Sequence, residues 1–145
     1  MKVEGTYKIP APAARVWQKL MDPEVLRRSM PGCEKLEPDG ENSYRAVMKA
    51  GVGPVKGTFN SQITLSDIRP ESGYTLLSRA KAPVGFVEGS GRVDLVEMDG
   101  ETIIHFLGEV KVGGMLASVG GRLVEAAAQK NIRDTLDNLA REVAA

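Results

Sequence analysis

Few side chains in this sequence could do acid–base or nucleophilic chemistry, and those few do not form a catalytic set. A hydrolytic triad needs a serine or cysteine beside a histidine and an orienting acid. His105 is the only histidine, and the alternation around it puts it on the strand face opposite Phe106. We therefore predict no catalytic residues and expect a protein that is not an enzyme.

Metal and phosphate chemistry are just as poorly represented. One histidine and one cysteine cannot supply a zinc ligand set, and the acidic residues lack the spacing of a calcium loop. The glycines from Gly85 to Gly91 lack the lysine and the following helix of a phosphate-binding loop. Cys33 has no adjacent cation or helix start, which favours an inert, buried thiol over a reactive one. We predict no metal site and no cofactor.

Glu125 is the most informative polar residue, because it falls on the predicted sheet-facing side of a helix. A carboxylate in that position must be hydrogen-bonded, paired or protonated, and it could hold the polar head of a ligand. Alternatively, Glu125 lies in the first turn of a helix that begins near Gly121, where the helix dipole favours an acid and Arg122 can pair with it. The sequence favours this second position and leaves the first open.

The element that carries Glu125 is the segment from Gly113 to Ala145, which is predicted to form one long helix. Its second half has an apolar stripe at three- and four-residue spacing, formed by Ile132, Leu136, Leu139 and Val143. Projected backwards, the same stripe reaches Ala128, Glu125, Gly121 and Ser118. A continuous helix would leave a gap under its first half and fill the space under its second. Gly120 and Gly121 together cost about 2 kcal/mol relative to alanine, so a break is equally compatible with the sequence.

The other side of this helix is charged. Arg133, Asp137 and Arg141 follow one another at four-residue spacing, where opposite charges can pair. We expect a solvated face with ion pairs along it.

The rest of the chain shows mostly two-residue alternation. Residues 3 to 9 alternate as a half-buried strand, and two short helices follow, the second capped by Asp22 and Pro23 and running through Arg28. From Cys33 to Val112 the alternation is interrupted at five turns, which predicts six further strands. Short connections favour an antiparallel meander covered by the long helix, an α+β fold. At 145 residues, 1–145 is predicted to be a single domain.

Glycine occurs repeatedly on the inward face of the predicted sheet. A glycine inside a strand marks a bend, a bulge or the close approach of another group. Inward glycines beneath a helix with small residues on its inner face predict a cavity, although each glycine alone could simply bend the sheet. The candidate ligand-binding residues are Met48, Gly57, Phe59, Ser61, Phe86, Gly89, Gly91, Phe106, Gly108, Met115, Val119, Gly121, Glu125 and Ala128. A ligand is expected under the segment from Met115 to Ala128, with the segment from Ile132 to Val143 closing the far end.

Four motifs also resemble a known family. They are Asp22-Pro23-Glu24-Val25-Leu26, Met30-Pro31-Gly32-Cys33-Glu34, the run from Val52 to Phe59, and Val112-Gly113-Gly114-Met115-Leu116-Ala117 with Gly120 or Gly121 before Arg122-Leu123. In this order and spacing they resemble the carbon monoxide dehydrogenase CoxG family of the START-like (SRPBCC) helix-grip superfamily. The resemblance covers nearly the whole chain. It implies a seven-stranded antiparallel sheet that grips a long C-terminal helix, with two short helices after the first strand and a lipophilic cavity between sheet and helix.

The same resemblance implies a role beside molybdenum-containing, carbon monoxide dehydrogenase-like hydroxylases, in maturation, membrane recruitment or quinone delivery. Longer members continue into a proline-rich linker and an apolar tail, whereas this sequence stops at Ala145. Direct anchoring to a membrane is therefore not expected.

Composition restricts the partners. A formal net charge of +0 with interspersed acids and bases gives no electrostatic surface for nucleic acid. No apolar run approaches the roughly 20 residues that span a bilayer, and no signal segment follows Met1. We expect a cytoplasmic protein that reaches the inner face of a membrane, if at all, through a partner.

Three functional hypotheses result. The first is a non-enzymatic accessory or carrier protein that binds a quinone or lipid-like molecule for a molybdenum hydroxylase. The second is a cyclase- or hydrolase-like enzyme that uses the same cavity, with Glu125 as its only strong acid or base. The third is a docking module without a ligand, which contacts a hydroxylase through the outer sheet face or through the loops at 30–33 and 51–54.

Overall fold

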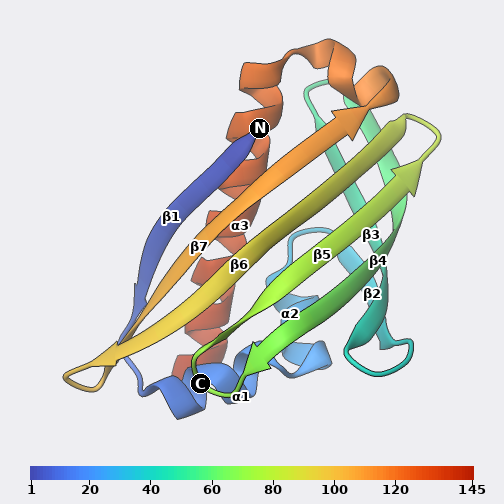
Figure 1. The fold of residues 1–145 in the computed structure, drawn as a ribbon. Helices are drawn as coiled ribbons and strands as arrows, with labels where there is room; N and C mark the ends of the chain where they lie inside the picture. Colours follow the sequence, from blue (N-terminus) through green and yellow to red (C-terminus); the bar gives the residue numbers. More distant parts are fainter.

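A computed structural model describes residues 1–145 as one antiparallel sheet curved around a long helix (Figure 1). The chain begins with β1 (Lys2–Ile9), α1 (Ala13–Leu20) and α2 (Pro23–Ser29). The strands that follow are β2 (Cys33–Pro38), β3 (Ser43–Val52), β4 (Val55–Arg69), β5 (Gly73–Ala82), β6 (Gly85–Met98) and β7 (Glu101–Gly113). A short 3₁₀ helix, η1 (Gly114–Val119), leads into α3 (Gly121–Ala144). This is the predicted α+β fold.

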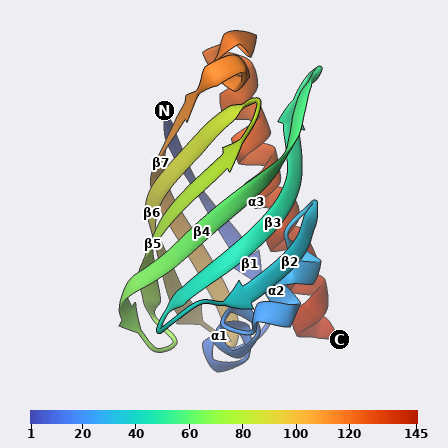
Figure 2. The same cartoon turned by 90° about the vertical axis from the view of Figure 1, so that its right-hand side faces the viewer.

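The seven strands follow the order β1-β7-β6-β5-β4-β3-β2, and all neighbours are antiparallel. Strands β2 to β7 form the predicted meander. Strand β1 forms one edge of the sheet and pairs along β7 from Lys2↔Glu109 to Ile9↔Thr102. Figure 2 shows the sheet curling so that β1 and β2 approach α3 from opposite sides. The sheet therefore surrounds the helix on its concave face.

The hydrophobic core lies at the end of the molecule where α1 and α2 close the space between sheet and helix (Figure 1). Ile9, Val16 and Leu139 have no exposed surface, and Ile104 is 1 % exposed. The Trp17 ring packs 6.0 Å from that of Tyr74, centroid to centroid. Asp22 accepts a hydrogen bond from the Glu24 amide at 3.0 Å, which is the cap that the sequence predicts for α2.

The C-terminal segment is not one continuous helix. Gly120 has φ +99° and ψ 146°, which ends η1 and starts α3 one residue later. Glycine adopts this positive φ without steric cost. Of the two possibilities that the glycine pair allowed, a continuous helix and a broken one, the structure has the broken one. Leu116 of η1 is 3 % exposed and packs into the end of the hollow that a continuous helix would have left empty.

Two of the inward glycines allow strands β6 and β7 to approach closely. Gly91 and Gly108 lie directly opposite each other. A Cβ on Gly91 would stand 2.9 Å from the Leu107 carbonyl oxygen, and one on Gly108 would stand 2.6 Å from that of Ser90. Gly89 differs, because a Cβ there would meet nothing closer than 3.9 Å. The glycines at 91 and 108 therefore permit the curvature of the sheet.

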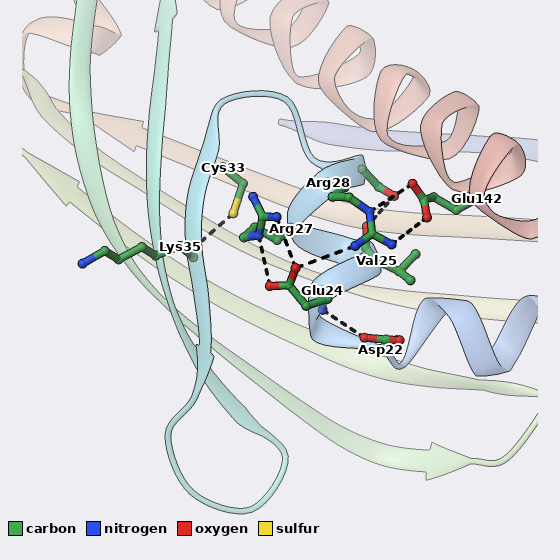
Figure 3. Close-up of polar contacts among 9 residues, drawn as sticks. Asp22, Glu24, Val25, Arg27, Arg28, Cys33, Lys35 and Glu142 are labelled. Atoms are coloured by element: carbon green, nitrogen blue, oxygen red, sulfur yellow. Dashed lines mark hydrogen bonds and ion pairs between the residues drawn. The ribbon is translucent and has the colours of Figure 1, made fainter. Parts of the chain in front are cut away.

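Polar contacts fix α3 to the elements at either side of it. Arg28 of α2 donates to both carboxylate oxygens of Glu142, at 2.8 and 3.2 Å, and Glu24 binds Arg27 on the same helix (Figure 3). These bonds hold the pKa of Glu142 below its usual value. The clamp ties α2 to the last turns of α3.

On the opposite flank, the Tyr7 hydroxyl of β1 donates to Asp137 at 2.5 Å. The predicted pairs of Asp137 with Arg133 and Arg141 are not formed, because Asp137 is turned towards the sheet edge instead of along the helix. The ion pair between two side chains of α3 joins Lys130 to Asp134 instead. Burial, followed by the hydrogen bond and charge of Asp137, raises the pKa of Tyr7 to about 12.

Candidate functional site

The concave face of the sheet and the inner side of α3 enclose an elongated apolar hollow with two lobes. The main lobe has a volume of about 340 Å³, and 16 of its 20 lining residues are hydrophobic. It lies between the middle of α3 and the end closed by α1 and α2. Its lining includes Leu20, Met21, Leu26, Met30, Leu36, Leu65, Leu76, Ile104, Phe106 and Leu136.

The second lobe continues towards η1 and has a volume of about 300 Å³. Its walls come from strands β3 to β7 on one side and from Val124, Ala127 and Ala128 of α3 on the other. The two lobes share five lining residues, so they form one hollow. These shared residues, here called the waist, are Met48, Ser61, Ser78, Asn131 and Ile132.

No Asp, Glu, His, Lys or Arg lines either lobe. The polar side chains are those of Ser61, Ser78, Asn131 and Thr135, together with the phenols of Tyr44 and Tyr74. Tyr74 is 7 % exposed, and burial followed by the nearby Tyr44 raises the pKa of its hydroxyl. At neutral pH the whole lining is therefore uncharged, and it can offer hydrogen bonds but no counter-ion.

Several predicted site residues line the hollow. Met48 and Ser61 lie at the waist, Phe106 in the main lobe, and Phe59 and Ala128 in the second lobe. Gly89, Gly91 and Gly108 line an adjacent depression of about 200 Å³ at the β6–β7 pair, which shares Leu76, Val93, Phe106 and Ile132 with the main lobe. The alternation of the strands is sufficient to find the strand positions among them, because it fixes which side chains point inward.

The other predicted residues lie outside the hollow. Gly57 and Phe86 line shallow depressions at the β3–β4 and β5–β6 turns. A Cβ on Gly57 would stand 2.9 Å from Val84 Cγ2, so that glycine permits packing against a neighbouring turn. Met115 is 61 % exposed, Val119 is half-buried, and Gly121 and Glu125 are exposed; none of these four borders either lobe.

The extrapolated stripe of the helix is thus wrong at its first half. Val124 is 4 % exposed and faces the hollow, whereas its neighbour Glu125 faces solvent. The projection of one straight stripe along α3 assumes that the helix packs on a flat sheet. This sheet is twisted, so the side of α3 that faces the sheet changes gradually along the helix. The second lobe lies under the predicted segment from Met115 to Ala128, where Leu116, Val124 and Ala128 line it, but the hollow extends beyond that segment. The main lobe lies under Asn131 to Leu136. Within the proposed closing segment, Leu136, Leu139 and Val143 are buried in the core, and Leu136 also lines the lobe.

Sequence reasoning found Ser61 but missed Ser78 and Asn131 at the waist, and it missed the contribution of α1, α2 and β2. Asn131 interrupts the apolar side of α3 next to Ile132, a signal that the straight projection hid. Met21 and Met30 fit a flexible apolar wall, but nothing in their local pattern separates such a wall from ordinary core.

Two reactive side chains lie apart from the hollow. The Cys33 thiol is half-buried at the start of β2, and burial raises its pKa despite the nearby Arg27 (Figure 3). It donates weakly to the Lys35 carbonyl at 3.3 Å. His105 is on the outer face of the sheet, 3.7 Å from the Glu4 carboxylate. No group of three or more His, Cys, Asp or Glu side chains could hold a metal ion, and no helix is both long and apolar enough to cross a membrane.

A seven-stranded antiparallel sheet, a gripped C-terminal helix and an apolar hollow between them define a helix-grip protein. The sequence model for the G subunit of carbon monoxide dehydrogenase (CoxG) matches residues 5–144. The chain belongs to this family, as its four motifs predict. None of the curated proteins compared with it matches.

Solved structures agree with this assignment. A conserved protein from Geobacillus kaustophilus is 32% identical and superimposes with a TM-score of 0.95, over 99% of this chain and 95% of that one. A Thermus thermophilus protein is 18% identical, with a TM-score of 0.73 over 99% and 97% of the two chains. The Zhui aromatase/cyclase from Streptomyces sp. R1128 is 20% identical, with a TM-score of 0.71 over 99% and 93%. The last two share the fold alone.

Proposed function

We propose that this protein binds a lipophilic small molecule, a quinone or a lipid-like compound, in the hollow between the sheet and α3. The observation that carries this proposal is a hollow whose main lobe alone measures about 340 Å³ and whose lining is mostly hydrophobic. Ligand sites in proteins have volumes in this range and combine apolar walls with a few polar groups. Transferring apolar ligand surface from water gains about 25 cal/mol per Å², which supplies the driving force.

We further propose that the bound molecule serves a carbon monoxide dehydrogenase-like molybdenum hydroxylase, with this chain as its accessory or carrier protein. Family membership supports this part. A binding role is proposed instead of cyclase or hydrolase chemistry because neither lobe has a carboxylate, imidazole or amine to act as acid or base. Glu125, the acid on which the enzymatic hypothesis depended, is exposed.

Extraction of the purified protein tests the binding. Protein prepared without detergent is extracted with organic solvent, and the extract is analysed by mass spectrometry beside one from the Ala128→Leu variant, whose larger side chain enters the second lobe. We expect a lipophilic compound from the native protein and less of it from the variant. Repeated absence of any ligand, together with no binding of an added quinone, would contradict the proposal.

Co-purification tests the partner. A carrier should associate with hydroxylase subunits and lose its effect on their electron transfer when Ala128→Leu blocks the hollow. A docking module would keep both the association and the effect in that variant. Ala126→Leu, an exposed position on the same helix, serves as the control.

A further inference from the structure

The waist of the hollow carries polar side chains from two different walls. Ser61 of β4 and Ser78 of β5 lie on neighbouring strands, and their hydroxyl oxygens are 3.4 Å apart. Ser61 is only 7 % exposed. Asn131 reaches the same place from α3. Polar groups are thus concentrated at one level of a hollow that is otherwise largely apolar.

The Asn131 side chain has unused hydrogen-bonding capacity. Its backbone carbonyl accepts from the Thr135 hydroxyl at 2.8 Å, but its amide group forms no hydrogen bond within the protein. The long contact between Ser61 and Ser78 uses one hydroxyl hydrogen and leaves the other free. Asn131 is half-buried, so a ligand that fills the hollow would remove its amide group from water. Polar groups that are buried normally have hydrogen-bond partners. A ligand oxygen placed between these side chains would provide one.

The absence of charge along both lobes restricts the ligand further. An ionised carboxylate or phosphate inside either lobe would lose its hydration and find no cation to replace it. A carbonyl or hydroxyl oxygen has no such penalty and can accept from Asn131 and a serine.

We infer that the ligand is an uncharged lipophilic molecule whose carbonyl or hydroxyl oxygen is held at the waist by Asn131 and the Ser61–Ser78 pair. Its apolar parts extend into the lobes on either side. This inference rests on the proposed binding function and adds the charge state of the ligand and the residues that recognise its polar atom.

Displacement of the uncharged fluorescent probe N-phenyl-1-naphthylamine tests the inference. Methyl laurate and laurate at pH 8 have the same chain and differ in charge at one end. We expect methyl laurate to displace the probe at a concentration at least tenfold lower than laurate. Equal or tighter binding of laurate overturns the uncharged-ligand inference while leaving a lipophilic site in place.

The Asn131→Leu variant tests the recognition residue, with decylubiquinone as a carbonyl-bearing ligand. Leucine has nearly the same size but no amide, so decylubiquinone affinity should fall about tenfold while the naphthylamine probe still binds. Asn60→Leu makes the same change on the exposed face of β4 and should leave both affinities unchanged. Unchanged decylubiquinone affinity in Asn131→Leu overturns the role of the waist. If that variant does not fold, the Ser61→Ala/Ser78→Ala double variant replaces it. Failure of every probe to bind the native protein overturns the proposed function itself.

Discussion

Two leucines of α3 show that location, and not residue type, sets the contribution of a side chain to stability. Leu139 has no exposed surface and packs against the core, while Leu123 is 57 % exposed. Leu139→Ala should lower the free energy of unfolding by about 2 to 5 kcal/mol, because it removes buried methyl groups and leaves a void. Leu123→Ala should change it by less than about 0.5 kcal/mol. Urea denaturation of both variants measures the difference, and equal losses would contradict the placement of α3.

At the same scale, strand residues of the site were predictable and helix residues were less so. Ser61, Met48 and Phe106 follow from alternation, since a side chain on a strand has only two directions to point. Asn131 and Glu125 depend on the phase of a helix, where each residue turns by about 100° and a small rotation of the contact side replaces one residue with its neighbour. That sensitivity explains why the projected stripe includes Glu125 and omits Val124. The exposed position that the sequence favours for Glu125 is the one observed.

The curvature of the sheet depends on particular glycines of β6 and β7. Gly91 and Gly89 lie two residues apart on one face of one strand, but a Cβ on Gly91 would meet backbone at 2.9 Å and one on Gly89 would not. Gly91→Ala should therefore destabilise the protein by about 1 to 3 kcal/mol through strain. Gly89→Ala should be neutral or slightly stabilising, because alanine restricts the unfolded chain. Thermal melts compare the two, and equal tolerance of both substitutions would mean that curvature does not need the close approach.

The contact between β1 and α3 should make stability depend on alkaline pH. The pKa of Tyr7 is raised from 10.0 to about 12, so the folded chain holds this proton more tightly than the unfolded chain. Its contribution is complete below pH 10 and is lost as the pH rises from about 10 to 12. Tyr7→Phe should cost about 1 kcal/mol at neutral pH and should remove this part of the pH dependence. Urea midpoints at pH 8.5 and 11 test it; equal declines in the native protein and the variant would argue against the Asp137 hydrogen bond.

At the scale of elements, the strands, turns and short helices were predictable because proline, glycine and aspartate signals separate them clearly. The interruption at Gly120 was not decidable, since a glycine pair fits a kinked helix as well as a broken one.

For the whole molecule, the family motifs predicted the helix grip. The position of the hollow depends on how a twisted sheet, α1 and α2 meet α3, which no local pattern encodes. The hollow accordingly extends further along α3 than the sequence indicated.

The hollow also determines how the whole molecule should respond to its ligand. Binding to the folded state at one hundred times the dissociation constant stabilises it by about 2.7 kcal/mol, which for a chain of this size raises Tm by roughly 5 to 10 °C. Ala128→Leu should keep the Tm of the free protein, because the second lobe has room for the added methyl groups, and should lose most of the ligand-induced rise. Ala126→Leu is exposed on the same helix and should retain the full rise. Fluorescence melts with and without decylubiquinone measure both quantities. Equal shifts in the two variants would place the ligand outside the second lobe, whereas a lower Tm for free Ala128→Leu would mean that the lobe is too narrow for a leucine.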